Sequence, residues 1–194
     1  YILGAGIYSE GSLTILNSTI SDNRSNWNCG GIVNAGIATV ISSTISHNST
    51  RGGGGICNTA GAVMIIRDSN VIRNGATDND GGITNLGELT LIQTTVSGNL
   101  AQFAGGIFNT GILNIDSSTI SGNEGSVQGG GILNSVGATA TITNSTISGN
   151  RTDSVGGGLS NGGTLTLLNS TVTDNTTWEA GGGIHNFDRA PLPG

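Results

Sequence analysis

The chain has 194 residues, a length typical of one domain, with 35 glycines and a formal net charge of −6. Only 9% of the residues are charged, 4% are aromatic and none is lysine. A chain of this charge lacks the basic surface that binds nucleic acid or anionic lipid, and no apolar run is long enough to span a membrane. We therefore expect no nucleic-acid partner and no membrane span.

A repeat of about 25 residues runs through the chain. Each copy places an apolar anchor after a glycine run, as in residues 129–134 (Gly-Gly-Gly-Ile-Leu-Asn). The anchors are Ile7, Ile32, Ile56, Ile83, Ile107, Ile132, Leu159 and Ile184. Subtracting successive anchor positions gives intervals of 24 to 27 residues. A fixed period of this length is typical of a solenoid.

Short alternating segments follow each anchor. In the first copy Leu13 and Ile15 flank Thr14, and Ile20 lies between Thr19 and Ser21. This alternation predicts brief strands, three in each coil, and glycine interrupts every stretch that could form a helix. We predict an all-β, right-handed, single-stranded parallel β-helix of about seven coils over residues 1–186. Residues 187–194 contain both prolines and are expected to be a tail that breaks the repeat.

Two columns of asparagine accompany the repeat. Stacked asparagine side chains can hydrogen-bond from coil to coil and tolerate left-handed backbone, so we expect both columns to be structural. The first column lies two residues after the anchors: Asn34, Asn58, Asn85, Asn109, Asn134, Asn161 and Asn186. The second column is Asn23, Asn48, Asn74, Asn99, Asn123, Asn150 and Asn175.

Cys29 and Cys57 occupy different registers of the repeat. Cys29 lies three residues before Ile32, whereas Cys57 lies one residue after Ile56. Parallel coils stack equivalent positions on one another, so we expect the two cysteines not to face each other.

The repeat resembles the polymorphic outer-membrane protein repeats of bacterial surface proteins. The matching residues are 105–107, 129–132 and 181–184 for the glycine-rich element, and 120–123 and 147–150 for the element that ends in asparagine. Isoleucine or valine stands where that family has phenylalanine in its second element. The resemblance spans residues 4–186 and implies a right-handed β-helix in a secreted or surface-displayed stalk, often adhesive, with no catalytic residues. It also implies a bacterial-type extracellular location.

Candidate binding residues lie in the segments that return to the next anchor. Trp27, Phe103 and Trp178 are the expected contacts to a glycan or a protein surface. Asp78 and Asp80 form the densest group of oxygen ligands and are a weak Ca²⁺ candidate beside the alternative of a solvated loop. We expect no cofactor.

An enzyme is not expected. Polysaccharide lyases and hydrolases of this fold use clustered carboxylates, whereas Asp68 and Asp116 lie two coils apart, about 10 Å. His47 and His185 lack an acidic partner in register, and His185 is expected to point outward into solvent. A carbohydrate-binding or polysaccharide-cleaving β-helix is the alternative.

An outward array of hydroxyl groups offers a minor alternative. The pair Thr19 and Ser21 recurs as Thr44 and Ser46 and at the same positions of later coils. This array of hydroxyl groups resembles the face of ice-binding solenoids. Threonine and serine also suit any exposed strand face. We predict a non-catalytic extracellular structural or adhesive segment whose uncapped ends favour end-to-end self-association.

Overall fold

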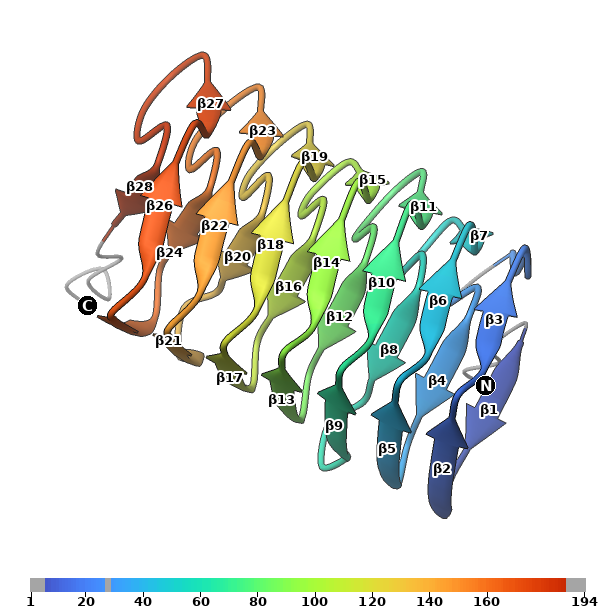
Figure 1. The fold of residues 1–194 in the computed structure, drawn as a ribbon. Helices are drawn as coiled ribbons and strands as arrows, with labels where there is room; N and C mark the ends of the chain where they lie inside the picture. The colour runs from blue at the N-terminus through green and yellow to red at the C-terminus, as the bar shows by residue number, and fades with distance from the viewer. Residues whose placement is uncertain (1–5, 27–28, 188–194) are drawn as a thin grey trace, which may run out of the picture.

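The computed structural model describes residues 6–26 and 29–187, and every regular element in these ranges is a β-strand. The strands wind into a parallel β-solenoid of about seven coils, with β1 at one end and β28 at the other (Figure 1). The predicted all-β solenoid is therefore confirmed. In this part of the chain no helix has the length and apolar character needed to cross a membrane.

The strands form four parallel sheets, which we name A to D. Sheet A contains β1 (Ile7–Ser9), β4 (Ile32–Asn34), β8 (Ile56–Asn58), β12 (Ile83–Asn85), β16 (Ile107–Asn109), β20 (Ile132–Asn134), β24 (Leu159–Asn161) and β28 (Ile184–Asn186). Sheet B contains β2 (Ser12–Leu16), β5 (Ile37–Ile41), β9 (Val63–Arg67), β13 (Glu88–Ile92), β17 (Ile112–Asp116), β21 (Thr139–Thr143) and β25 (Thr164–Leu168).

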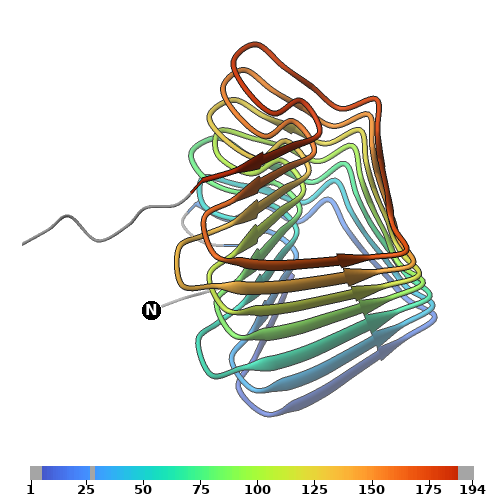
Figure 2. The ribbon, with the colours of Figure 1, turned by 90° about the vertical axis from the view of Figure 1, so that its left-hand side faces the viewer.

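Sheets C and D complete each coil. Sheet C contains β3 (Thr19–Ser21), β6 (Thr44–Ser46), β10 (Asn70–Ile72), β14 (Thr95–Ser97), β18 (Thr119–Ser121), β22 (Thr146–Ser148) and β26 (Thr171–Thr173). Sheet D contains β7 (Ser49–Thr50), β11 (Gly75–Ala76), β15 (Leu100–Ala101), β19 (Glu124–Gly125), β23 (Arg151–Thr152) and β27 (Thr176–Thr177). Viewed toward the C-terminal end, the coils outline a triangle, with sheet B as one flat side (Figure 2).

The prediction of three strands in each coil is wrong, because sheet D supplies a fourth. Its strands are two residues long and carry sequences as different as Gly75–Ala76 and Arg151–Thr152. Two residues cannot display the alternation that identifies a strand in a sequence. Pairing with the neighbouring coil, rather than intrinsic propensity, makes these segments strands.

The core follows the predicted columns. The anchors Ile32, Ile83 and Ile107 are fully buried, and each pairs in register with the anchor of the next coil, as Ile107 does with Ile132. Inward residues of sheets B and C continue the same apolar cluster. In the first and last described coils Leu13 and Leu167 are only partly buried, because β2 and β25 each pair with a neighbouring strand on one side.

Both asparagine columns form the expected coil-to-coil ladders. In the first, Asn85 Nδ2 donates to Asn109 Oδ1 at 2.7 Å, and Asn109 Nδ2 donates to Asn134 Oδ1 at 2.8 Å. In the second, Asn99 Nδ2 donates to Asn123 Oδ1 at 2.9 Å. These amides are buried, so their hydrogen bonds remove the penalty of burying an unpaired polar group.

A third ladder was not predicted. It consists of hydroxyl side chains at the bend between sheets B and C, where the backbone N–H of one coil donates to the hydroxyl of the next, as Thr94 does to Ser118 Oγ at 3.0 Å. Bonds of this kind join Ser18, Ser43 and Ser69 in succession, and then Thr94, Ser118, Ser145 and Ser170. The residue preceding each one has left-handed backbone, including Gln93 at φ 48°. A hydroxyl residue recurs at this position in every coil of the sequence, and that recurrence could have revealed the ladder.

Of the predicted tail, only Phe187 belongs to the described residues. Its backbone N–H donates to the Asn161 carbonyl oxygen at 2.9 Å, so it continues the coil-to-coil bonding beyond Asn186. Its ring stacks on His185 with 5.4 Å between centroids. Residues 188–194 lie outside the described part of the chain.

Candidate ligand-binding groove

The candidate site lies on the outer face of sheet A. The middle residue of each sheet A strand points away from the core, and together these residues form a column that we name the outer column: Tyr8, Val33, Cys57, Thr84, Phe108, Leu133, Ser160 and His185. Although they point outward, Val33 and Ser160 are fully buried. The segments returning from sheet D lie against this face and cover parts of it.

The return segments carry a second column beside the outer column. Bridges join Cys29 to Gly53 and Gly53 to Asp80 in parallel register. Each of these residues precedes its outer-column neighbour by four positions, as Asp80 precedes Thr84. Side chains of the two columns therefore face each other across the return segment.

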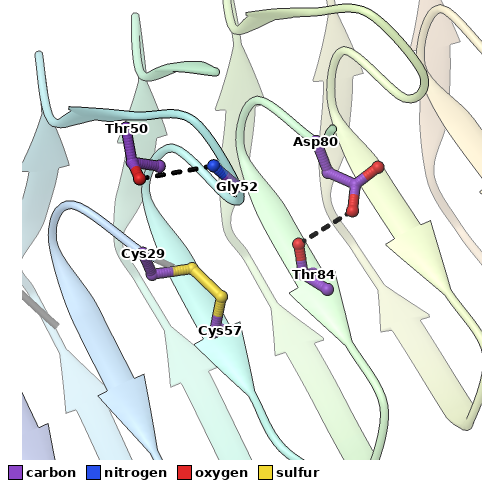
Figure 3. Close-up of a disulfide and its surroundings, with 6 residues drawn as sticks. All are labelled: Cys29, Thr50, Gly52, Cys57, Asp80 and Thr84. Atoms are coloured by element: carbon purple, nitrogen blue, oxygen red, sulfur yellow. Dashed lines mark hydrogen bonds between the residues drawn. A yellow bond between two sulfur atoms is a disulfide. The ribbon is translucent and has the colours of Figure 1, made fainter. Parts of the chain in front are cut away.

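Cys29 and Cys57 form a disulfide, with 5.8 Å between their Cα atoms (Figure 3). The expectation that these cysteines do not face each other is wrong. That expectation assumed that only residues of the same column contact each other. Cys29 belongs to the column of the return segments, and its side chain extends to Cys57 in the outer column. Gly53 lies between the two positions, and a Cβ atom there would approach Cys29 Sγ to 2.7 Å and Cys57 Sγ to 3.0 Å. Glycine thus leaves the space that the disulfide fills.

Asp80 is the buried charged group of the same pair of columns. Its side chain is 5% exposed and accepts a hydrogen bond from Thr84 Oγ1 at 3.0 Å (Figure 3). Burial raises the pKa of Asp80 to about 7, and the hydrogen bonds from Thr84 and the Ala104 backbone oppose this increase only in part. Asp80 can therefore hold or release a proton near neutral pH.

A hollow of about 520 Å³ opens beside Asp80. Phe103 and Phe108 supply its aromatic walls, and Leu133 adds apolar surface. Its polar groups come from Asn79, Asp80, Thr84, Gln128 and Ser135. Apolar walls with a few convergent polar groups are typical of ligand sites.

A second hollow of about 270 Å³ continues the first toward the C-terminal coils. The two share Gln128, Leu133 and Ser135, and the second adds Val136 and Phe187. We call the combined hollows the sheet A groove. Because it extends from Asp80 to Phe187 along the stacked coils, its shape suits an elongated ligand.

The structure separates Phe103 from Trp178, two of the three predicted contact residues. Phe103 lies in the sheet A groove and is 39% exposed. Trp178 is 77% exposed and lies beside Arg151, whose guanidinium carbon is 6.0 Å from the ring centroid. Arg151 also pairs with Glu124 and Asp153. Trp27 lies outside the described residues.

Asp78 and Asp80 line different hollows. Asp80 faces the sheet A groove, whereas Asp78 is exposed and lines an open hollow of about 540 Å³ with Arg24 and Arg51. The structure does not bring the two carboxylates together as a shared cation site. Within the described residues no cluster of three or more histidine, cysteine, aspartate or glutamate side chains could hold a metal ion.

Other predicted polar residues also stay apart. Asp116 accepts hydrogen bonds from Asn144 and Thr143, which lower its pKa, and its strand pairs Asp116 with Ile92 rather than with the column of Asp68. His47 occupies a bend at φ 55°. His185 points outward as expected but is half-buried against Phe187, and its Nδ1 has no hydrogen-bond partner among the described residues.

The hydroxyl array of sheet C is in register. Thr19 pairs with Thr44 and Ser21 with Ser46, and Asn70 with Ile72 interrupts the array in β10. Sequence reasoning identified this array but missed the sheet A groove. The available signal was the outer column itself, where Phe108 and Leu133 occupy positions that an uncovered sheet would give to polar residues.

No protein-family model matches the chain, and searches of curated proteins and of solved structures also found no match. The structure shows an all-β parallel solenoid with stacked asparagine side chains.

Proposed function

We propose that this solenoid is a non-catalytic extracellular structural and adhesive segment that binds an extended glycan along the sheet A groove. The observation that carries the proposal is the lining of that groove, where Phe103, Phe108 and Asp80 border one hollow. The apolar face of a sugar ring packs on aromatic side chains, while its hydroxyl groups exchange hydrogen bonds with carboxylate, amide and hydroxyl groups.

The disulfide supports the extracellular part of the proposal. Disulfides persist in oxidising environments such as the cell exterior and the bacterial periplasm. Cys29 and Cys57 are bonded beside the groove, so they stiffen the surface that borders it. We further propose membership of the bacterial surface repeats that the sequence resembles, because the glycine runs and asparagine ladders take the places that a stacked repeat requires.

Binding is favoured over cleavage by the groove's carboxylate content. Glycoside hydrolysis generally uses two carboxyl groups roughly 5–9.5 Å apart. Asp80 is the one carboxylate among the described residues that line the groove. A single buried acid can orient a sugar hydroxyl, but it does not supply both a general acid and a base or nucleophile.

A glycan array with the purified chain, followed by calorimetry on its best ligand, tests the proposal. Phe108→Ala should weaken binding about 10- to 100-fold, roughly 1–3 kcal/mol, because it removes an aromatic wall. Trp178→Ala is the matched control, since it removes an exposed aromatic ring away from the groove. Unchanged affinity in Phe108→Ala, with the fold verified by circular dichroism, would overturn the proposal.

The alternatives give different results in the same experiment. Loss of binding in Trp178→Ala alone would place adhesion on the side of sheet D. Release of reducing sugar ends that disappears in Asp80→Asn would establish a cleaving enzyme. Thermal hysteresis without glycan binding would indicate the hydroxyl array of sheet C as an ice-binding face.

A further inference from the structure

The outer face of sheet B is flat, uncovered and rich in apolar side chains. Leu16 is 55% exposed, Ile37 59%, Ile112 49% and Leu168 53%. Further outward apolar residues are Ile41, Val63, Ile65 and Ile92. In Figure 2 no described segment lies over this side of the triangle.

Such a face differs from an ordinary solvated sheet. Parallel sheets usually have both faces covered, and contiguous exposed apolar patches commonly mark interaction sites. The remaining outward residues are mainly threonines, such as Thr39 and Thr90, which add methyl groups to the surface. The face therefore has the composition of an interface rather than of a charged surface.

The few charges on this face have a self-complementary arrangement. The last residues of the sheet B strands form one column, in which Arg67 and Asp116 lie on either side of Ile92. Arg67 is one coil before Ile92 and Asp116 one coil after it. A twofold rotation about an axis along β13 exchanges these two positions.

We propose that the outer face of sheet B is a homodimer interface, in which two copies pack face to face about a twofold axis parallel to β13. The coil order of the second copy is then reversed. Arg67 of each copy faces Asp116 of the other, and Ile92 lies on the axis. The same rotation places Leu16 opposite Leu168 and Val63 opposite Ile112, so apolar contacts surround the two ion pairs.

Asp116 and Arg67 are both charged and available for this pairing. Asp116 is held by Asn144 Nδ2 at 2.9 Å, Thr143 Oγ1 at 2.8 Å and Ser117 Oγ at 3.1 Å. These hydrogen bonds lower the pKa of Asp116 and keep it ionised. Arg67 is exposed and forms no ion pair within residues 6–26 and 29–187. An isologous dimer gives each of these charges a partner.

The size of the face also fits a dimer. Seven strands about 4.8 Å apart, each about 16 Å long, cover a plane of roughly 550 Å². A standard interface buries roughly 800 Å² of accessible surface per partner, and side chains that project from a plane expose more surface than the plane itself. Glu88 lies at the margin of the face in β13, so the twofold axis places it opposite Glu88 of the second copy. Repulsion between the two Glu88 carboxylates limits the affinity of the dimer, and removing that repulsion provides a test of the interface.

Sedimentation velocity of the purified chain over a range of concentrations tests the interface. We expect a dimer for the natural sequence and at least tenfold weaker association for Arg67→Asp and for Asp116→Arg, because each places like charges opposite each other twice. Glu88→Gln should tighten the dimer, because it removes the repulsion on the axis. Arg24→Asp, away from sheet B, should leave association unchanged.

Mixing the two charge variants should restore association as a heterodimer. The two substituted side chains then carry opposite charges and face each other, while the unchanged Asp116 of the first variant faces the unchanged Arg67 of the second. Neither variant alone offers this complementarity, so the mixture separates specific pairing from a general loss of solubility or fold.

Specific results would overturn the proposal. The proposal is overturned if the chain stays monomeric at its highest soluble concentration. It is also overturned if both charge variants are folded by circular dichroism but their mixture forms no heterodimers. Open-ended oligomers insensitive to Arg67→Asp would show end-to-end association instead.

Discussion

Single buried amides fix the stacking of the coils. Asn109 accepts one hydrogen bond from Asn85 and donates to Asn134, and its Nδ2 also donates to the Thr139 carbonyl oxygen at 3.1 Å. A coil shifted by one residue would leave such groups unpaired, and each unpaired buried group costs about 1–3 kcal/mol. The ladders therefore add to the register that the buried apolar face of each strand already specifies.

Asp80 should make the stability of the protein depend on pH. Its pKa is about 7 in the folded chain and 3.8 in its ordinary state, so the folded state binds more protons between these values. The free energy of unfolding should fall as pH rises from 4 to 7, by a few kcal/mol in total, and this loss should level off above 7. Asp80→Asn should remove that decrease in urea unfolding curves measured at several pH values.

The exposed Asp78→Asn variant is the control for loss of one negative charge near the same segment. If Asp80→Asn and the natural chain show the same dependence of stability on pH, burial does not control this carboxyl group.

At the scale of elements, the bends between sheets A and B occur in two forms. The short form, such as Asn109-Thr110-Gly111, brings the backbones of successive coils into close contact. The longer form inserts two residues and closes a turn, in which the Ala138 N–H donates to the Ser135 carbonyl oxygen at 3.0 Å and Gly137 has φ +80°. This geometry fits a type II turn. The two extra residues leave room for a Cβ atom at the last position of the bend, which is alanine in the longer form and glycine in the short form.

Gly111→Ala should therefore destabilise the solenoid by roughly 2–4 kcal/mol, the range of severe packing defects. A Cβ atom at this position would lie 2.1 Å from the Gly87 carbonyl oxygen, which belongs to the backbone and cannot rotate away. Gly11 occupies the same column in the first coil and has nothing within 4 Å of its Cβ position. Gly11→Ala should change the midpoint of chemical unfolding little, and equal effects of the two variants would contradict this explanation.

At the scale of the whole molecule, each coil contacts mainly its neighbours, so stability varies along the axis. The disulfide joins positions 28 residues apart near the N-terminal coils. Closing a loop of this length stabilises a chain by about 3–4 kcal/mol. In a linear array that gain stays near the cross-link instead of spreading through one core.

The Cys29→Ala/Cys57→Ala double variant should lose its stability locally. Hydrogen exchange should accelerate in the coils around β4 and β8, because only these coils lose the cross-link. The coils around β20 and β24 should retain their protection and serve as the internal control. Uniform acceleration along the chain would show that the solenoid unfolds as one cooperative unit.

The sequence predicted what repeats in every coil. The anchors, the inward columns and both asparagine ladders recur at a fixed period, so position in the repeat determines position in space. Sheet D was missed because two-residue strands such as Glu124–Gly125 have no pattern of their own.

The disulfide and the sheet A groove depend on contacts between different columns. The period of the repeat does not reveal those contacts, because they follow from the path of the return segments. Gly53 and Asp80 show this difference: they share one column, yet one makes room for sulfur atoms and the other buries a carboxyl group.

The asparagine ladders give the solenoid a dipole along its axis. In both ladders each Nδ2 donates to the Oδ1 of the following coil, from Asn34 to Asn186 and from Asn23 to Asn175. Their amide dipoles add along the axis, as peptide dipoles do in an α-helix. Within the described coils the amide oxygens of both ladders therefore point toward the coil of β1 and the NH₂ groups toward the coil of β28. Any further coil, from this chain or from another copy, can extend the two ladders only if it stacks in the same orientation, head to tail.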